Sequence, residues 1–168
     1  MNLGVKCIIA DYELAEGDGL SFLEEVAHLY PDSGRVLLTG HADTNVMRRA
    51  VNDAKVHQAF YKPVEYVEFV KAISNLVVGS SMIDTQLRSD GKPHYHGRWD
   101  SVGVEPLLPE PEDESVSQSS SGDLILVVDE LADMRALMSS ILKKRGYRVI
   151  TASTGYRGLE LARERRPD

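Results

Sequence analysis

The sequence has little cysteine and little aromatic content. One cysteine, Cys7, occurs among 168 residues, and aromatic residues make up 7%. A single thiol forms no intramolecular disulfide, so a disulfide-stapled scaffold is excluded and a reducing compartment fits. Because Cys7 lies inside an apolar run, we interpret it as a small buried hydrophobic residue.

Long apolar runs and excess positive charge are also missing. No stretch approaches the length of a membrane-spanning helix, and the first residues lack the charged and apolar regions of a signal peptide. The net charge of −7 argues against nucleic-acid binding through bulk electrostatics. These absences predict a cytoplasmic protein that contacts neither membrane nor nucleic acid. Hydrophobic residues, at 42%, suffice for one ordinary domain or two small ones.

Residues 1–78 alternate short apolar runs with amphipathic stretches. The runs predict strands at 5–10, 35–39 and 57–61, and the stretches predict helices at 19–30, from 43 onward and at 65–78. We expect Asp43 to cap the second helix, which carries Val46, Met47, Ala50 and Val51. In the third helix, Val67, Val70, Ile73 and Val77 recur at helical spacing. The alternation predicts a parallel sheet with helices on both faces.

The rest of the chain divides into a polar segment and a second alternating one. Residues 79–122 contain nine Ser, five Gly and four Pro, so we predict a flexible linker. Residues 123–168 predict strands at 124–128 and 147–151, a helix that ends at Gly146, and a helix at 155–166. Residues 1–78 carry seven basic and eleven acidic residues, whereas 123–168 carry nine and seven. The first segment is therefore net negative and the second net positive, and this difference in charge attracts them weakly to each other.

A polar side chain ends or follows each of four predicted strands. Asp11, Thr39 and Lys62 come from the first segment, and the pair Asp129-Glu130 comes from the second. Ligands of open α/β sheets bind beyond the carboxyl ends of the strands, so in one shared sheet these groups converge. Three carboxylates, a hydroxyl and an ammonium have the composition of a Mg²⁺-assisted phosphoryl-acceptor site.

Each residue also has a purely structural explanation. An aspartate after a strand is usually a turn or cap residue, and an acidic pair suits the first turn of a helix. Lys62 could equally be a surface lysine whose aliphatic stem packs against the protein. Thr39 could be a strand-end residue whose hydroxyl is hydrogen-bonded locally. Taken together, with their strand context, the four positions favour the site.

These motifs resemble the receiver domains of two-component response regulators. Asp11, with Asp18-Gly19 seven and eight residues later, is similar to the phosphoacceptor stretch, and Leu37 to Gly40 is similar to the strand that bears the phosphate-binding hydroxyl. Lys62-Pro63 is similar to the lysine that contacts the phosphoryl group and the proline after it. The stretch from Val127 to Glu130 is similar to the strand end that bears the metal-binding acidic pair. Residues 1–78 resemble the second part of a receiver, from its third strand onward, and residues 123–168 resemble the first part.

The resemblance implies a flavodoxin-like, doubly wound, five-stranded parallel sheet of order 2-1-3-4-5. It would be assembled here in permuted order, within one chain or by swapping between two chains in a homodimer. Asp11 would accept the phosphoryl group, which Thr39 and Lys62 would contact. Mg²⁺ would be held by Asp11, Asp129, Glu130 and the backbone carbonyl of Glu13. The implied donor is a sensor histidine kinase or a histidine phosphotransfer protein, so the chain would be a signalling domain rather than an enzyme.

Three positions depart from the family pattern. Ala15 stands where proline is frequent, Glu130 where aspartate is commonest, and Ala59 where a switching tyrosine or phenylalanine is usual. These departures keep open a receiver-like interaction module that is not phosphorylated. A phosphohydrolase with an aspartate nucleophile is a further alternative, because Glu13 lies two residues after Asp11. The reversed order of the motifs is explained by a fragment across two tandem receivers or by a permutation.

Overall fold

The computed structural model describes residues 4–40, 43–78 and 122–165. All of the predicted linker at 79–122 except Gly122 lies outside the described residues. Strands and helices alternate along the chain, in the order β1 (Val5–Asp11), α1 (Gly19–Leu29), β2 (Gly34–Thr39), α2 (Thr44–Asn52), β3 (Gln58–Tyr61), α3 (Tyr66–Val78), β4 (Leu124–Val128), α4 (Ala132–Lys144), β5 (Arg148–Ala152) and α5 (Gly155–Glu164). None of the described helices is both long and apolar enough to cross a membrane.

The strands form one five-stranded sheet in the order β3-β2-β1-β4-β5, and every neighbouring pair is parallel. The two alternating segments of the sequence meet at its centre, where Ile8 of β1 pairs with Leu126 of β4. Burial on both faces explains why these central strands are continuous apolar runs rather than alternating ones. The expected parallel α/β architecture is confirmed, with both segments in a single sheet.

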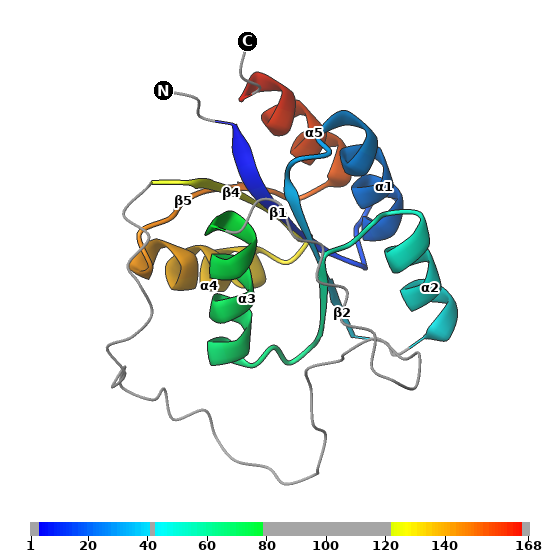
Figure 1. Ribbon diagram of the computed structural model, residues 1–168, viewed down its shortest axis with the longest axis horizontal. Coiled ribbons are helices and arrows are strands. Elements are labelled where there is room, and N and C mark those ends of the chain that lie inside the picture. The colour runs from blue at the N-terminus through cyan, green and yellow to red at the C-terminus, as the bar shows by residue number, and fades with distance from the viewer. Residues whose placement is uncertain (1–3, 41–42, 79–121, 166–168) are drawn as a thin grey trace, which may run out of the picture.

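Helices cover both faces of the sheet (Figure 1), with α1, α2 and α5 on one side and α3 and α4 on the other. Successive strand residues point to opposite faces, so each strand contributes to two cores. The first core, under α1, α2 and α5, includes Ile8, Ala10, Leu23, Leu37, Val46, Leu126 and Leu159. The second, under α3 and α4, includes Cys7, Ile9, Leu38, Phe60, Phe69, Ile73, Val127 and Leu142. Burial raises the pKa of the Cys7 thiol to about 12, as expected for an inert core residue.

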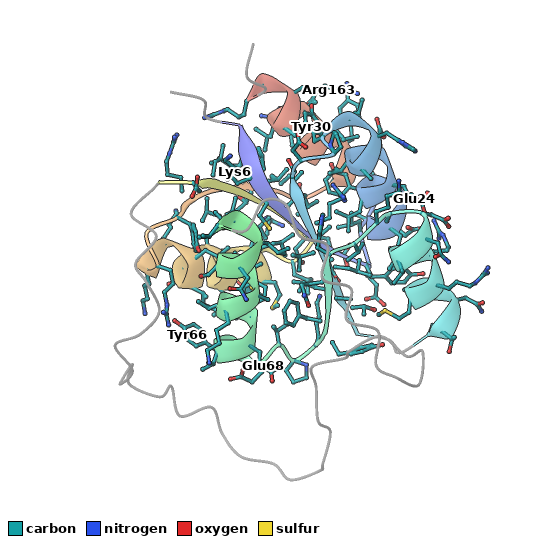
Figure 2. All side chains as sticks on the ribbon, in the orientation of Figure 1. Lys6, Glu24, Tyr30, Tyr66, Glu68 and Arg163 are labelled. Carbon is teal, nitrogen blue, oxygen red and sulfur yellow. The ribbon has the colours of Figure 1, made fainter. Side chains whose placement is uncertain are left out.

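Side-chain contacts also join the two segments. The hydroxyls of Ser74 and Tyr147 form a hydrogen bond of 3.0 Å between α3 and the turn after α4. The guanidinium of Arg145 lies 5.7 Å from the ring centroid of Tyr66, which Figure 2 labels at the start of α3. Arg163 of α5 lies 3.6 Å from the carboxylate of Glu25 on α1. The segments are thus connected on both faces of the sheet.

Two valines predicted on buried helix faces are exposed instead, so these predictions are wrong. Val51 of α2 is 42% exposed and Val67 of α3 is 44% exposed. At 3.6 residues per turn, Val67 lies roughly 100° around the helix from the centre of the face that buries Phe69, Val70 and Ile73. The other residues named on these two helices are buried, so each exposed valine lies at the edge of a face that the spacing predicts: Val46, Met47 and Ala50 on α2, and Val70, Ile73 and Val77 on α3.

A buried arginine closes the end of the sheet opposite the predicted site. Arg35, 4% exposed, donates from its guanidinium to the carbonyls of Tyr30, Pro31, Ser33 and Lys55 rather than to a carboxylate. Its backbone N–H donates to Nδ1 of His57 at 3.0 Å. Burial and the nearby Arg35 charge lower the pKa of His57, which keeps its ring neutral and able to accept this bond.

Candidate functional site

Three of the predicted site residues follow strands at the carboxyl edge of the sheet. Asp11 ends β1, Asp129 follows β4, and Lys62 follows β3. Ala10 pairs with Val128, so Asp11 and Asp129 come next on adjacent strands. The backbone N–H of Lys62 donates to the carbonyl of Thr39 at 2.9 Å, which fixes the turn after β3 beside the end of β2.

The Lys62 ammonium links the two aspartates. Its Nζ donates to Oδ2 of Asp11 at 2.7 Å and lies 3.7 Å from Oδ2 of Asp129. The side chains of Asp11 and Asp129 are 4% and 1% exposed, and that of Lys62 is 24% exposed. Low solvent access strengthens attraction between the ammonium and the carboxylates, and it equally strengthens repulsion between the two carboxylates.

Asp129 is incompletely satisfied by its neighbours. Its Oδ1 accepts the backbone N–H of Leu131 at 2.8 Å, whereas Oδ2 is buried and has no hydrogen-bond partner. Burial is the main cause that raises the pKa of Asp129, and the negative charge of Asp11 raises it further. The Leu131 N–H and the Lys62 ammonium act in the opposite direction. A buried acceptor without a donor, beside a second carboxylate, is an arrangement that a cation would stabilise.

The other predicted residues lie around this group. Thr39 is fully buried at the end of β2. Glu130 is exposed, and Glu13 is exposed in the loop after β1, where it forms an isolated antiparallel bridge with Asp18. Within residues 4–40, 43–78 and 122–165, no three His, Cys, Asp or Glu side chains are grouped closely enough to hold a metal ion. The structure therefore gathers Asp11, Lys62 and Asp129, and leaves the Glu130 side chain at the surface.

The loop after Asp11 returns tightly to the strand that it leaves. Gly19 donates its backbone N–H to the carbonyl of Tyr12 at 2.9 Å. A Cβ atom at Gly19 would overlap the backbone carbonyl of Asp11, so a glycine is required at this position. Asp18 caps α1 by accepting the N–H of Ser21 at 2.7 Å. The Asp-Gly pair thus has a local structural reason for lying seven and eight residues after Asp11.

Arg135 at the start of α4 is a site neighbour that the sequence did not reveal. Its NH1 nitrogen donates to the backbone carbonyls of Asp129 at 2.7 Å and Glu130 at 2.8 Å. The only sequence signal was an arginine five or six residues after an acidic pair, which is also common on solvated helix faces.

Comparison with known proteins gives partial similarities. No family model matches the chain. The hydrogenase transcriptional regulatory protein HoxA of Bradyrhizobium diazoefficiens is 27% identical over 73 residues, which is 44% of this chain and 15% of that protein. The chain therefore spans about 15% of the length of this curated relative.

Two solved structures are similar over part of the chain. One is the signal receiver domain of an HD domain-containing protein from Pseudomonas fluorescens Pf-5, with 26% identity, a TM-score of 0.44 and coverage of 45% of this chain and 56% of that one. The other is a CheY-like response regulator receiver domain protein from Methanospirillum hungatei JF-1, with 21% identity, a TM-score of 0.43 and coverage of 45% and 59%.

Proposed function

We propose that this chain is a phospho-accepting receiver module of a two-component phosphorelay, with Asp11 as the acceptor. The observation that carries the proposal is the Lys62 ammonium, 2.7 Å from the Asp11 carboxylate and 3.7 Å from that of Asp129. These three side chains come from distant parts of the sequence and meet at the sheet edge where open α/β sheets bind their ligands. The similarity to a transcriptional regulatory protein is in keeping with a signalling role.

We further propose that the receiver is assembled in permuted order. Counted with β4 and β5 first, the observed sheet reads 2-1-3-4-5, as the resemblance implies. Residues 123–168 would then be the first part of the receiver, residues 1–78 the second, and residues 79–122 the linker. Analytical ultracentrifugation distinguishes the two forms of assembly: a monomer supports closure within one chain, and a stable dimer supports swapping.

The proposed reaction is a transfer of a phosphoryl group from a phosphohistidine. A carboxylate oxygen of Asp11 attacks phosphorus, the P–N bond breaks, and its electron pair returns to the imidazole of the donor, which takes up a proton. The product on this chain is an acyl phosphate. Lys62 offsets negative charge on the transferring group, and Thr39 would donate its hydroxyl to a phosphoryl oxygen. The donor would be a sensor histidine kinase or a histidine phosphotransfer protein.

The site residues fit a Mg²⁺ ion. The orphaned Asp129 Oδ2 and the neighbouring Asp11 carboxylate are hard oxygen donors that share one ammonium, that of Lys62. Asp11 and Asp129 would hold the ion, together with Glu130 and the backbone carbonyl of Glu13. When bound, the ion supplies positive charge that neutralises the phosphoryl oxygens.

Phosphorylation with a small donor tests the proposal. Incubation with acetyl phosphate and Mg²⁺ should add one phosphate per chain, measured by intact-mass spectrometry. Asp11→Asn should abolish the addition, because an amide is not a nucleophile towards phosphorus. Asp32→Asn is the matched control, since Asp32 is exposed and precedes β2, at the end of the sheet opposite the site, and it should be labelled like the wild type. Labelling that persists in Asp11→Asn would overturn the assignment.

The exposed side chain of Glu130 favours a second candidate, a receiver-like interaction module that does not accept phosphate. Absence of both Mg²⁺ binding and labelling in the wild type would support it. Continuous release of phosphate, with no stable phosphoprotein, would instead support an aspartate-dependent phosphohydrolase.

A further inference from the structure

The start of α4 is built differently from the starts of three other helices. The side chains of Asp18, Asp43 and Thr154 each accept a backbone N–H at the beginning of α1, α2 and α5. The residue in the same position before α4, Leu131, has no polar side chain and makes no capping bond. The N–H of Leu131 is satisfied instead by the carboxylate of Asp129. The start of α4 and the geometry of the site are therefore coupled through one carboxylate.

Arg135 holds this turn from within the helix. A single guanidinium nitrogen donates to the carbonyls of Asp129 and Glu130, at 2.7 Å and 2.8 Å. The backbone N–H of Arg135 donates to the carbonyl of Leu131 at 3.1 Å. Hydrogen bonds from a charged donor are shorter and stronger than neutral ones, and Arg135 is partly buried. One residue thus contacts three successive peptide units, from Asp129 to Leu131.

These contacts determine how Asp129 presents its free oxygen. Its N–H donates to the carbonyl of Ala152 at 3.2 Å, its carbonyl accepts from Arg135, and its Oδ1 accepts from Leu131. With the backbone and Oδ1 fixed, Oδ2 has little freedom, and it lies 3.7 Å from Lys62 Nζ without a hydrogen bond. Loss of the Arg135 bonds would free the peptide planes on which this geometry depends.

We propose that Arg135 is a positioning residue, which fixes the acidic turn so that Asp129 presents its free carboxylate oxygen to a divalent cation. The inference rests on the proposed function, because the cation is the one that the phosphoryl-accepting site would bind. Arg135 itself contacts backbone carbonyls and not the carboxylates, so it acts through the two acidic residues.

Mg²⁺ affinity separates this role from a merely structural one. The comparison uses the full chain as wild type, Arg135→Gln, Arg135→Lys and the control Lys143→Gln, which removes an exposed cation from the last turn of the same helix. Isothermal titration calorimetry with Mg²⁺ gives Kd, and thermal melting gives stability. Loss of a residue that orients metal ligands typically weakens binding about 10–100-fold, so we expect the Kd of Arg135→Gln to rise by about 10-fold.

The same geometry predicts the results for the other two variants and for the labelling rate. Arg135→Lys keeps a charged nitrogen donor and should recover part of the affinity, and Lys143→Gln should bind like the wild type. At saturating Mg²⁺ the rate of labelling by acetyl phosphate should be nearly the same in Arg135→Gln and the wild type. Weaker Mg²⁺ binding by Arg135→Gln, with an unchanged labelling rate at saturating Mg²⁺, supports a positioning role for Arg135. If Arg135→Gln melts lower but binds Mg²⁺ as tightly as the wild type, the inference is wrong.

A separate measurement keeps the two proposals distinguishable. If the wild type neither binds Mg²⁺ nor accepts phosphate, the proposed function fails. The positioning of Asp129 is then judged by hydrogen exchange of the Leu131 amide, which the Asp129 carboxylate protects. Faster exchange in Arg135→Gln than in Lys143→Gln supports it, and equal exchange overturns it.

Discussion

Replacing Lys62 by methionine measures how far the Lys62–Asp11 ion pair stabilises the metal-free protein. Methionine keeps much of the aliphatic stem but removes the ammonium that lies 2.7 Å from Asp11 and 3.7 Å from Asp129. Loss of one partner from a fully buried pair costs about 3–5 kcal/mol, because a charge is left buried without compensation. Since Lys62 is 24% exposed, solvent screens part of this loss, and we expect the free energy of unfolding to fall by about 2–3 kcal/mol.

Urea denaturation without divalent cations is the assay, with thermal melting as a second measure. For a chain of this size the expected loss corresponds to a fall in Tm of roughly 5–10 °C. The matched control is Lys71→Met, which makes the same substitution at an exposed position on α3 and should change stability by less than about 0.5 kcal/mol. Mg²⁺ should reduce the difference in unfolding free energy between Lys62→Met and the wild type, since the bound ion then screens the two aspartates in both proteins.

Two results would contradict a stabilising role for the Lys62–Asp11 ion pair. Equal destabilisation by Lys62→Met and Lys71→Met would mean that the buried ion pair contributes nothing beyond a surface charge. A stabilised Lys62→Met variant would mean that the cost of burying the ammonium exceeds its attraction to both carboxylates.

Three further predictions concern the rest of the molecule. Because the pKa of His57 is lowered in the folded protein, the neutral ring contributes stability above its ordinary pKa of 6.5, and this stability is lost as pH falls through the folded-state pKa. The Tm of the wild type should therefore fall on acidification. The Tm of His57→Asn should fall less, because asparagine does not titrate and keeps an acceptor for the Arg35 N–H. Tyr147→Phe removes the 3.0 Å bond to Ser74 and should lower the free energy of unfolding by about 1 kcal/mol in urea denaturation. Mg²⁺ should raise the Tm of the wild type more than that of Asp129→Ala, and equal increases would argue against a shared site.

Local patterns were enough to predict the elements of this fold. Apolar runs of strand length placed all five strands to within one residue at either end, because strands buried on both faces are largely apolar. The side chain of Asp43 caps α2 as predicted, accepting the N–H of Asn45 at 2.7 Å. Periodicity was less reliable for the orientation of a helix, as the exposed Val51 and Val67 show. Which face is buried depends on the partners that pack against the helix.

The candidate site was predicted in composition but not in geometry. Residue type and position after a strand indicated Asp11, Lys62 and Asp129, since the carboxyl ends of parallel strands meet at one edge. No sequence pattern indicated that Lys62 would lie between the two aspartates, that the Glu130 side chain would be exposed, or that Asp129 would keep an unpartnered oxygen. These features depend on side-chain orientation and on the packing of neighbouring strands.

The strands, the helices and the charged residues can be identified in the sequence alone, because they follow from local apolar spacing and side-chain chemistry. Tertiary packing, by contrast, pairs β4 with β1 and so joins two segments separated by residues 79–122 into one sheet. It also decided the roles of two arginines. Arg35 is buried because backbone carbonyls satisfy its guanidinium, and Arg135 reaches back to the carbonyls of the acidic turn. Contacts with backbone carbonyls leave no pattern in the sequence, since every residue carries the same acceptor.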